Sequence, residues 1–208
     1  MVTPPRQLKL LHTPEPVKLV QGLEYVPDYI PHNQQTELLQ HIDAQPWSQE
    51  LKRRVQHYGY RYNYKSRSVD PTMYLGALPD WLTPIAQRLH REGYINDLPD
   101  QVIINEYQPG QGITPHVDCT SCFTDTIISL SLGSPCIMDF IQKSMDEKKS
   151  LWLEPRSLLV MRNEARYQWQ HTIPARKTDT WQGNKIWRQR RVSLTFRKVI
   201  LADKALIS

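Results

Sequence analysis

The chain has 208 residues, of which 39% are hydrophobic and 23% charged, with a formal net charge of +5 and a pI near 9.1. No apolar run approaches the ~18 residues that a membrane helix needs, and three cysteines argue against a disulfide framework and for a reducing compartment. We therefore expect a monomeric intracellular protein, cytoplasmic or, in a eukaryotic host, nuclear, without membrane contact, whose charge permits a polyanionic partner.

The N-terminal segment contains four prolines and no apolar centre, which predicts an extended arm at residues 1–18 rather than a signal peptide. Residues 19–208 should then form a single domain. Apolar side chains at helical spacing predict helices over Pro31–Ile42 and Asp80–Arg91.

Between these helices, residues 53–65 carry tyrosines at alternate positions, which a strand would place on one face: Tyr58, Tyr60, Tyr62 and Tyr64. One interpretation is a hairpin whose tyrosines pack on the core. The other is a substrate lid, in which the rings stack on bases while Arg53 and Arg61 hold phosphates. Basic residues concentrate in Lys52–Arg67 and again in Arg176–Lys198, which would suit a phosphate backbone.

From residue 101 onward, short strand-like runs separated by Gly and Pro predict an antiparallel roll with flanking helices, a mainly β fold of the α+β class. The predicted strands are Val102–Tyr107, Thr126–Leu132, Cys136–Phe140, Ser157–Met161 and Arg191–Val199. The segment Lys143–Ser150 reads as a solvated turn between strands.

A His-X-Asp triplet, His116 to Asp118, follows a turn-rich loop. On an extended chain both side chains point the same way and can reach one ion, although such a triplet also occurs in surface turns. His171 is the candidate third ligand. Two imidazoles and one carboxylate that leave coordination positions open suit a non-haem Fe(II) oxygenase.

The last predicted strand places four polar side chains on one face, Arg191, Ser193, Thr195 and Arg197, and its apolar side chains on the other. Two guanidinium groups on the inner face indicate an anionic ligand. Asn105-X-Tyr107, His116-X-Asp118, His171 and Arg191-X5-Arg197, in this order and spacing, resemble the AlkB family of Fe(II)/2-oxoglutarate dioxygenases.

This resemblance, which runs from about Leu19 to Val199, implies a double-stranded β-helix, or jelly roll, with an N-terminal nucleotide-recognition lid. It implies Fe(II), 2-oxoglutarate and O2 as cofactors, with His116, Asp118 and His171 as catalytic metal ligands. The 2-oxoglutarate would be bound by Arg191 at its distal carboxylate, by Arg197 nearer the metal, and by Asn105, Tyr107 and Ser193. In the family the lid recognises the nucleotide, and Gly59-Tyr60-X-Tyr62 is similar to the lid sequence there.

For the substrate we expect Arg53, Arg61 and Thr120 as contacts and Tyr58, Tyr60 and Trp169 as stacking walls, although Trp169 could equally pack in the barrel. Thr120 stands where repair enzymes of the family carry an acidic residue. A hydroxyl group cannot supply negative charge near a cationic methylated base.

Three local runs resemble the branch of the family that hydroxylates tRNA wobble uridines: Arg53–Tyr60, Ile128–Ser134 and Pro155–Met161. We expect oxidative demethylation of N-alkylated bases in single-stranded DNA or RNA first, and hydroxylation of a modified tRNA uridine second. The alternatives are a protein-modifying dioxygenase and a binding module without turnover. A zinc or redox site at Cys119-X2-Cys122 has little support, because no second pair accompanies it.

Overall fold

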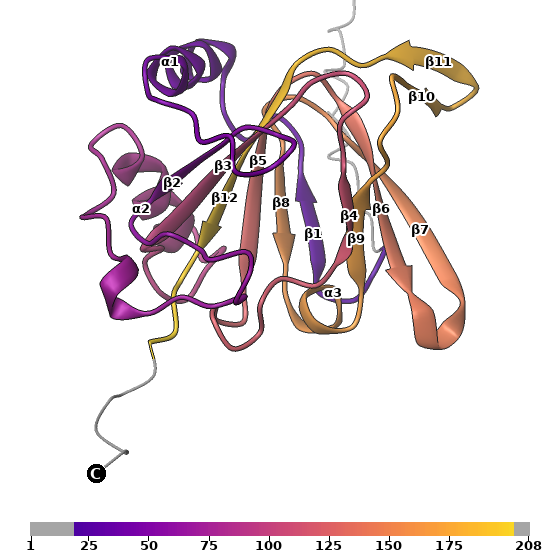
Figure 1. The fold of residues 1–208 in the computed structure, drawn as a ribbon. Helices are drawn as coiled ribbons and strands as arrows, with labels where there is room; N and C mark the ends of the chain where they lie inside the picture. Colours follow the sequence, from indigo (N-terminus) through magenta and orange to yellow (C-terminus); the bar gives the residue numbers. More distant parts are fainter. Residues whose placement is uncertain (1–18, 202–208) are drawn as a thin grey trace, which may run out of the picture.

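The computed structural model describes residues 19–201, which form two facing antiparallel sheets (Figure 1). The larger sheet runs β1 (Leu23–Val26), β8 (Leu158–Met161), β5 (Ile127–Gly133), β12 (Arg191–Arg197), β3 (Gln101–Tyr107) and β2 (Val55–Tyr58). The smaller sheet runs β4 (Ile113–His116), β9 (Gln170–Ile173), β6 (Cys136–Gln142) and β7 (Glu147–Leu153). Strands far apart in the sequence are neighbours in both sheets, as the predicted jelly roll requires.

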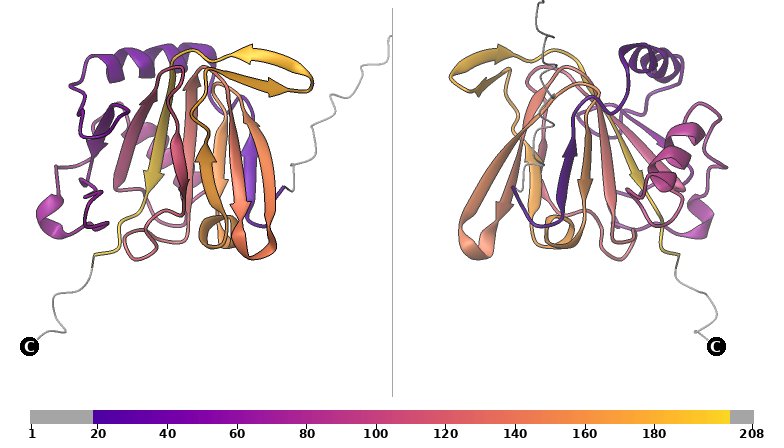
Figure 2. Two further views of the ribbon diagram at one scale, coloured as in Figure 1. Left: turned by 45° about the vertical axis from the view of Figure 1, so that its right-hand side comes forward. Right: turned by 180° about the vertical axis from the view of Figure 1, so that it is seen from behind.

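Two helices, α1 (His32–Asp43) and α2 (Thr83–Arg91), cover the outer face of the larger sheet (Figure 2). Leu38 and Ile42 of α1 pack in the same buried cluster as Val192 and Leu194 of β12. Because side chains alternate along a strand, the odd-numbered residues of β12 face the smaller sheet instead. The even-numbered side chains of β12 therefore pack in the apolar core under the helices, and the odd-numbered polar ones face the space between the sheets.

The layer between the sheets is apolar toward the β7 side, where Met138 and Phe140 of β6 pack with Leu159 and Met161 of β8. A one-turn helix, α3 (Asn163–Tyr167), connects β8 to β9. A separate hairpin of β10 (Thr178–Trp181) and β11 (Asn184–Trp187) projects from one end of the sandwich (Figure 2). Two short 3-10 turns complete the elements, Pro71–Met73 and Lys143–Met145.

Both predicted helices and all five predicted strands are present, with boundaries shifted by up to three residues. The solvated turn expected at residues 143–150 is wrong in its second half, because β7 begins at Glu147 and pairs with β6. The strand expected across residues 53–65 ends at Tyr58. The next residue, Gly59, has a φ of +76°, a backbone conformation that ends the strand. Only glycine fits there, because a Cβ would lie 1.8 Å from the carbonyl oxygen of Asp100.

The extended arm expected at residues 1–18 lies outside the described residues, as do residues 202–208. Within residues 19–201, no helix combines the length and apolar character needed to cross a membrane.

Candidate active site

A cavity of about 360 Å³ lies between the two sheets. Its walls come mainly from β3, β12, β4 and β9, together with the segments before and after β2. The polar and aromatic residues that line it are Arg53, Tyr62, Tyr64, Arg67, Asn105, Tyr107, Thr114, His116, Asp118, Phe123, Ser129, His171, Arg191, Ser193, Thr195 and Arg197. The cavity thus gathers the three expected metal ligands and all five residues expected to bind 2-oxoglutarate.

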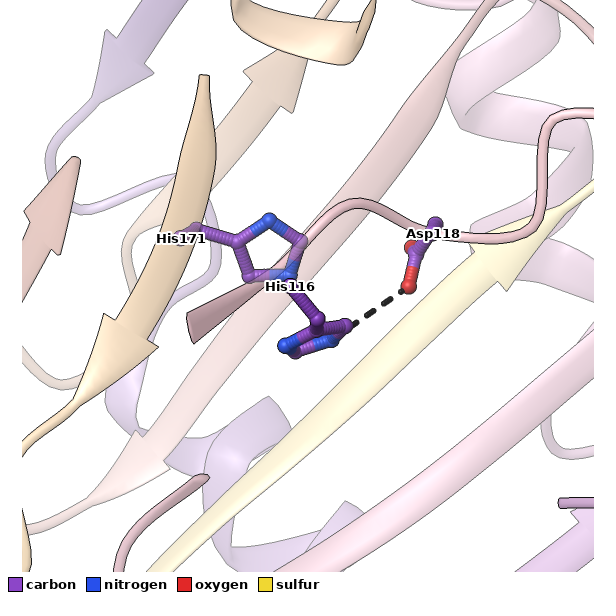
Figure 3. Close-up of side chains that lie close together, drawn as sticks. All are labelled: His116, Asp118 and His171. Atoms are coloured by element: carbon purple, nitrogen blue, oxygen red, sulfur yellow. Dashed lines mark ion pairs between the residues drawn. The ribbon is translucent and has the colours of Figure 1, made fainter. Parts of the chain in front are cut away.

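His116, Asp118 and His171 point toward one another in the cavity (Figure 3), and their ligand atoms all lie within 4.8 Å of one another. His116 ends β4 and pairs directly with His171 on β9, so the two imidazole rings have centroids 4.3 Å apart. Asp118 lies two residues beyond β4, in a segment without strand structure. Its carboxylate lies 3.6 Å from Nε2 of His116.

The close approach of β4 to β9 depends on a glycine at the start of β4. A Cβ at Gly112 would lie 2.1 Å from the carbonyl oxygen of Ile173, a separation that no side chain can occupy. The absence of a side chain at residue 112 therefore lets the strand with His116 lie beside the strand with His171.

The two histidines are held in place for metal binding by different neighbours. Nδ1 of His116 lies 2.8 Å from the carbonyl oxygen of Thr114, a contact that orients the ring so that Nε2 faces Asp118. Burial, with a smaller contribution from the neighbouring His116, lowers the pKa of His171 to about 3. His171 is therefore neutral at physiological pH, as a metal ligand must be.

Asp118 is held ionised by an arginine on β12. Burial raises the pKa of its carboxyl group, but the charge of Arg197 and the contact with His116 outweigh burial, so the pKa lies well below its usual range. Nη2 of Arg197 lies 3.2 Å from both carboxylate oxygens. Arg197 thus lies at the metal end of the cavity, where the sequence placed it.

Arg191, at the other end of β12, retains hydrogen-bonding capacity. The residue is only 3% exposed, and its Nη2 donates to the hydroxyl oxygen of Ser131 at 2.9 Å. Nε and Nη1 are buried without a partner in the described part of the chain. A buried guanidinium with unpaired N–H groups is costly unless an anion joins it, so this end of the cavity fits the distal carboxylate of 2-oxoglutarate.

Other residues expected at the cosubstrate line the same region. The guanidinium carbon of Arg191 lies over the ring of Tyr107, 5.4 Å from the ring centroid. Ser193 lies on the same face of β12 as Arg191. Asn105 is already engaged, because its Oδ1 accepts a hydrogen bond of 2.8 Å from Nε of Arg53. This bond holds Arg53 at the cavity wall.

The residues expected at the substrate are placed differently. Of the six, Arg53 alone lines the cavity. Tyr58 packs edge to face on Trp81 in the helix-side cluster, and Tyr60 packs on Tyr74. Trp169 is 3% exposed inside the cluster between the sheets. Arg61 is exposed in an ion pair with Glu50, and Thr120 is exposed outside the cavity.

The lining also includes three aromatic residues and one arginine that were not among the expected substrate contacts: Tyr62, Tyr64, Phe123 and Arg67. Tyr62 contacts Tyr64 edge to face and also lies 5.7 Å from the ring of Phe123, measured between centroids. The alternate tyrosines did signal an aromatic wall. The alternate spacing of the tyrosines could not show that the chain bends at Gly59. Beyond this bend Tyr62 and Tyr64 reach the cavity, whereas Tyr58 and Tyr60 do not.

Cys119 and Cys122 are joined by a disulfide across a tight turn, with Cα atoms 5.3 Å apart, while Cys136 is free and buried. The cysteine count argued against a disulfide framework, but these two form one bridge, because the turn between them brings their Cα atoms within disulfide range. Both sulfur atoms lie 3.3 Å from the carbonyl oxygen of Arg67, so this turn contacts the segment that carries Tyr62 and Tyr64.

Residues 22–197 match the family described as the 2OG-Fe(II) oxygenase superfamily. The "Alkylated DNA repair protein ALKBH8 homolog" of Arabidopsis thaliana is 41% identical over 203 residues, covering 86% of this chain and 59% of that protein. The "tRNA (carboxymethyluridine(34)-5-O)-methyltransferase ALKBH8" of Mus musculus is 40% identical over 202 residues, covering 86% of this chain and 30% of that protein.

The fold also matches solved structures. The structure of OsALKBH1 superposes with a TM-score of 0.62 at 16% identity, covering 85% of this chain and 98% of that chain. The predicted jelly roll is confirmed by this likeness. The role of residues 53–65 as a lid stays a prediction.

Proposed function

Because this chain belongs to the AlkB family within the 2OG-Fe(II) oxygenase superfamily, we propose that it hydroxylates an uncharged modified base in RNA, with a tRNA uridine as first candidate. Its cofactors are Fe(II) and 2-oxoglutarate, with O2 as oxidant. The iron, when bound, would supply an oxidation in which 2-oxoglutarate and O2 give succinate and carbon dioxide. One oxygen atom would enter succinate and the other a substrate C–H bond.

The residues divide this work along the cavity. His116, Asp118 and His171 would hold the iron, and Arg191 would hold the distal carboxylate of the cosubstrate by a charge-assisted fork. Positioning and exclusion of water are the protein's contribution to such chemistry. Tyr62 and Tyr64 offer aromatic faces on which a base could stack.

The charge of the cavity lining supports an uncharged base. Among the residues that the structure describes, Asp118 is the only carboxylate in the lining, and Arg197 is paired with it. The remaining cations are Arg191, which is assigned to the cosubstrate, and Arg53 and Arg67. A base that carries a positive charge, such as 1-methyladenine, would meet like charges and no free carboxylate.

This charge pattern reverses the order that the sequence suggested. A neutral uridine, or one with an acidic substituent, meets no repulsion from Arg53 and Arg67. The mouse relative's name, which specifies a uridine of tRNA, points the same way. Demethylation of N-alkylated bases remains the second candidate, because the Arabidopsis relative is named an alkylated DNA repair protein.

Mass spectrometry of treated RNA tests the proposal. The protein would be incubated with Fe(II), ascorbate and 2-oxoglutarate and with tRNA, or with one oligonucleotide sequence that contains either 3-methyluridine or 1-methyladenosine. We expect a uridine derivative of the tRNA to gain one oxygen atom, and the neutral 3-methyluridine to be a better substrate than the cationic base.

The variant His171→Ala serves as the control without the iron site. Loss of a methyl group from 1-methyladenosine, with no change in any uridine, would overturn the proposal in favour of repair. A protein-modifying enzyme would show no binding of single-stranded RNA, or binding that is insensitive to salt, whereas phosphate contacts make binding weaken as salt rises.

A further inference from the structure

Arg166, on the one-turn helix α3, is a buried arginine whose hydrogen-bond acceptors within residues 19–201 are all backbone carbonyl groups. Only 2% of the residue is exposed. Its guanidinium donates to the carbonyl oxygens of Asp118 at 2.9 Å, Cys119 at 3.1 Å, Phe123 at 3.3 Å and Thr124 at 3.3 Å. Four carbonyl groups from the two ends of one loop therefore converge on a single side chain.

Burial of the charged guanidinium of Arg166 costs free energy of folding, so a function of this side chain has to be considered. No carboxylate within residues 19–201 forms an ion pair with Arg166. Burial lowers the pKa of its guanidinium, and the nearby charge of Asp118 offsets this only in part. A buried cation without a counter-ion is destabilising unless hydrogen bonds replace its hydration. The planar fork of arginine can direct N–H groups at four separate carbonyl oxygens, a geometry that the single nitrogen of lysine cannot copy.

The loop that Arg166 holds supplies the carboxylate of the iron site. β4 ends at His116, and residues 117–126 form no regular strand, so no strand ladder fixes the backbone of Asp118. Arg197 contacts the carboxylate of Asp118, whereas Arg166 contacts its carbonyl oxygen. One arginine thus orients the side chain, and the other fixes the backbone that carries it.

We propose that Arg166 is a positioning residue for the iron site, which sets the backbone of Asp118 and links it to the segment that carries His171. The helix α3 ends at Tyr167 and β9 begins at Gln170, so His171 follows Arg166 by five residues along the same chain. The side chain of Arg166 thereby joins the two segments that provide the carboxylate and the distal imidazole. This role concerns metal binding and does not depend on which base is the substrate.

The test is a titration of the purified full chain with Co(II), followed by visible absorption, without substrate or turnover. Loss of a group that orients a metal ligand typically weakens metal binding by about 10–100-fold. We expect Arg166→Lys to weaken Co(II) binding by about tenfold or more.

Arg162→Lys is the matched control. Arg162 is the N-cap residue of the same helix and also donates to backbone carbonyls, those of Gly93 and Tyr94, which do not line the cavity. Thermal unfolding of both variants separates stability from affinity. If Arg166 only stabilises the fold, both variants will melt earlier and bind Co(II) like the wild type.

Wild-type Co(II) affinity in Arg166→Lys, or equal weakening in Arg162→Lys, would overturn the proposal. If Arg166→Lys does not fold, Arg166→Gln takes its place, because its amide retains two N–H donors for the loop. The same two outcomes then decide, and neither depends on the proposed RNA substrate.

Discussion

The two ends of the cavity are built in different ways. The cosubstrate end stands on regular strands, with Arg191, Ser193 and Arg197 at alternate positions of β12. The substrate end is formed by an irregular segment after β2, where Tyr62 and Tyr64 reach the cavity and Tyr58 does not. A strand fixes the direction of each side chain by its period of two, whereas a bent segment is directed by its tertiary contacts. Apart from Asp118, the expected iron and cosubstrate ligands lie on strands, whereas the proposed substrate contacts lie on the irregular segment.

The cosubstrate end should show the largest single effect. Replacement of Arg191 by Met removes one partner of a buried charged pair, which costs about 2–5 kcal/mol, so the KM for 2-oxoglutarate should rise by about 30-fold or more. Arg191→Lys should lie between Met and wild type, because lysine keeps the charge without the fork. Initial rates of succinate release over a range of 2-oxoglutarate concentrations measure this. An unchanged KM in Arg191→Met would show that Arg191 does not bind the distal carboxylate of 2-oxoglutarate.

The substrate end should show an intermediate effect that separates neighbouring tyrosines. Tyr64→Ala removes a ring from the cavity wall, and stacking on an aromatic side chain contributes about 1–3 kcal/mol per base, so binding of single-stranded RNA should weaken about fivefold or more. Tyr58→Ala should lower the melting temperature and leave RNA binding unchanged, because Tyr58 packs on Trp81. Fluorescence anisotropy at one fixed salt concentration compares the two. The reverse order would show that the segment rearranges when RNA binds.

The smallest effect is expected at Thr120, which is exposed outside the cavity. Thr120→Asp introduces an acidic residue at the position where repair enzymes of the family carry one. We expect a change in stability within about 0.5 kcal/mol and no new activity on 1-methyladenosine, because the carboxylate would not face the substrate. Succinate release with an oligonucleotide that contains 1-methyladenosine measures the activity, and thermal unfolding measures the stability. A strong gain of activity would place Thr120 at the base after all.

The same contrast explains what the sequence could reveal. The polar face of β12 follows from strand periodicity, whereas the order and spacing of the family motif supported His116, Asp118 and His171 as ligands. Trp169 shows the limit, because two residues before His171 is an equally good position for a core ring and for a cavity wall. Arg166 was not singled out, since its contacts join residues more than 40 positions apart that no local pattern connects.

Gly112 limits how the gene can vary at a residue that takes no part in the chemistry. Any side chain there would collide with the carbonyl oxygen of Ile173 and force β4 away from β9. The register that sets His116 beside His171 would then be lost, although both ligands remained intact. In a library of random substitutions, residue 112 should therefore be as intolerant as the metal ligands, and its variants would be misread as catalytic mutants unless iron binding were measured.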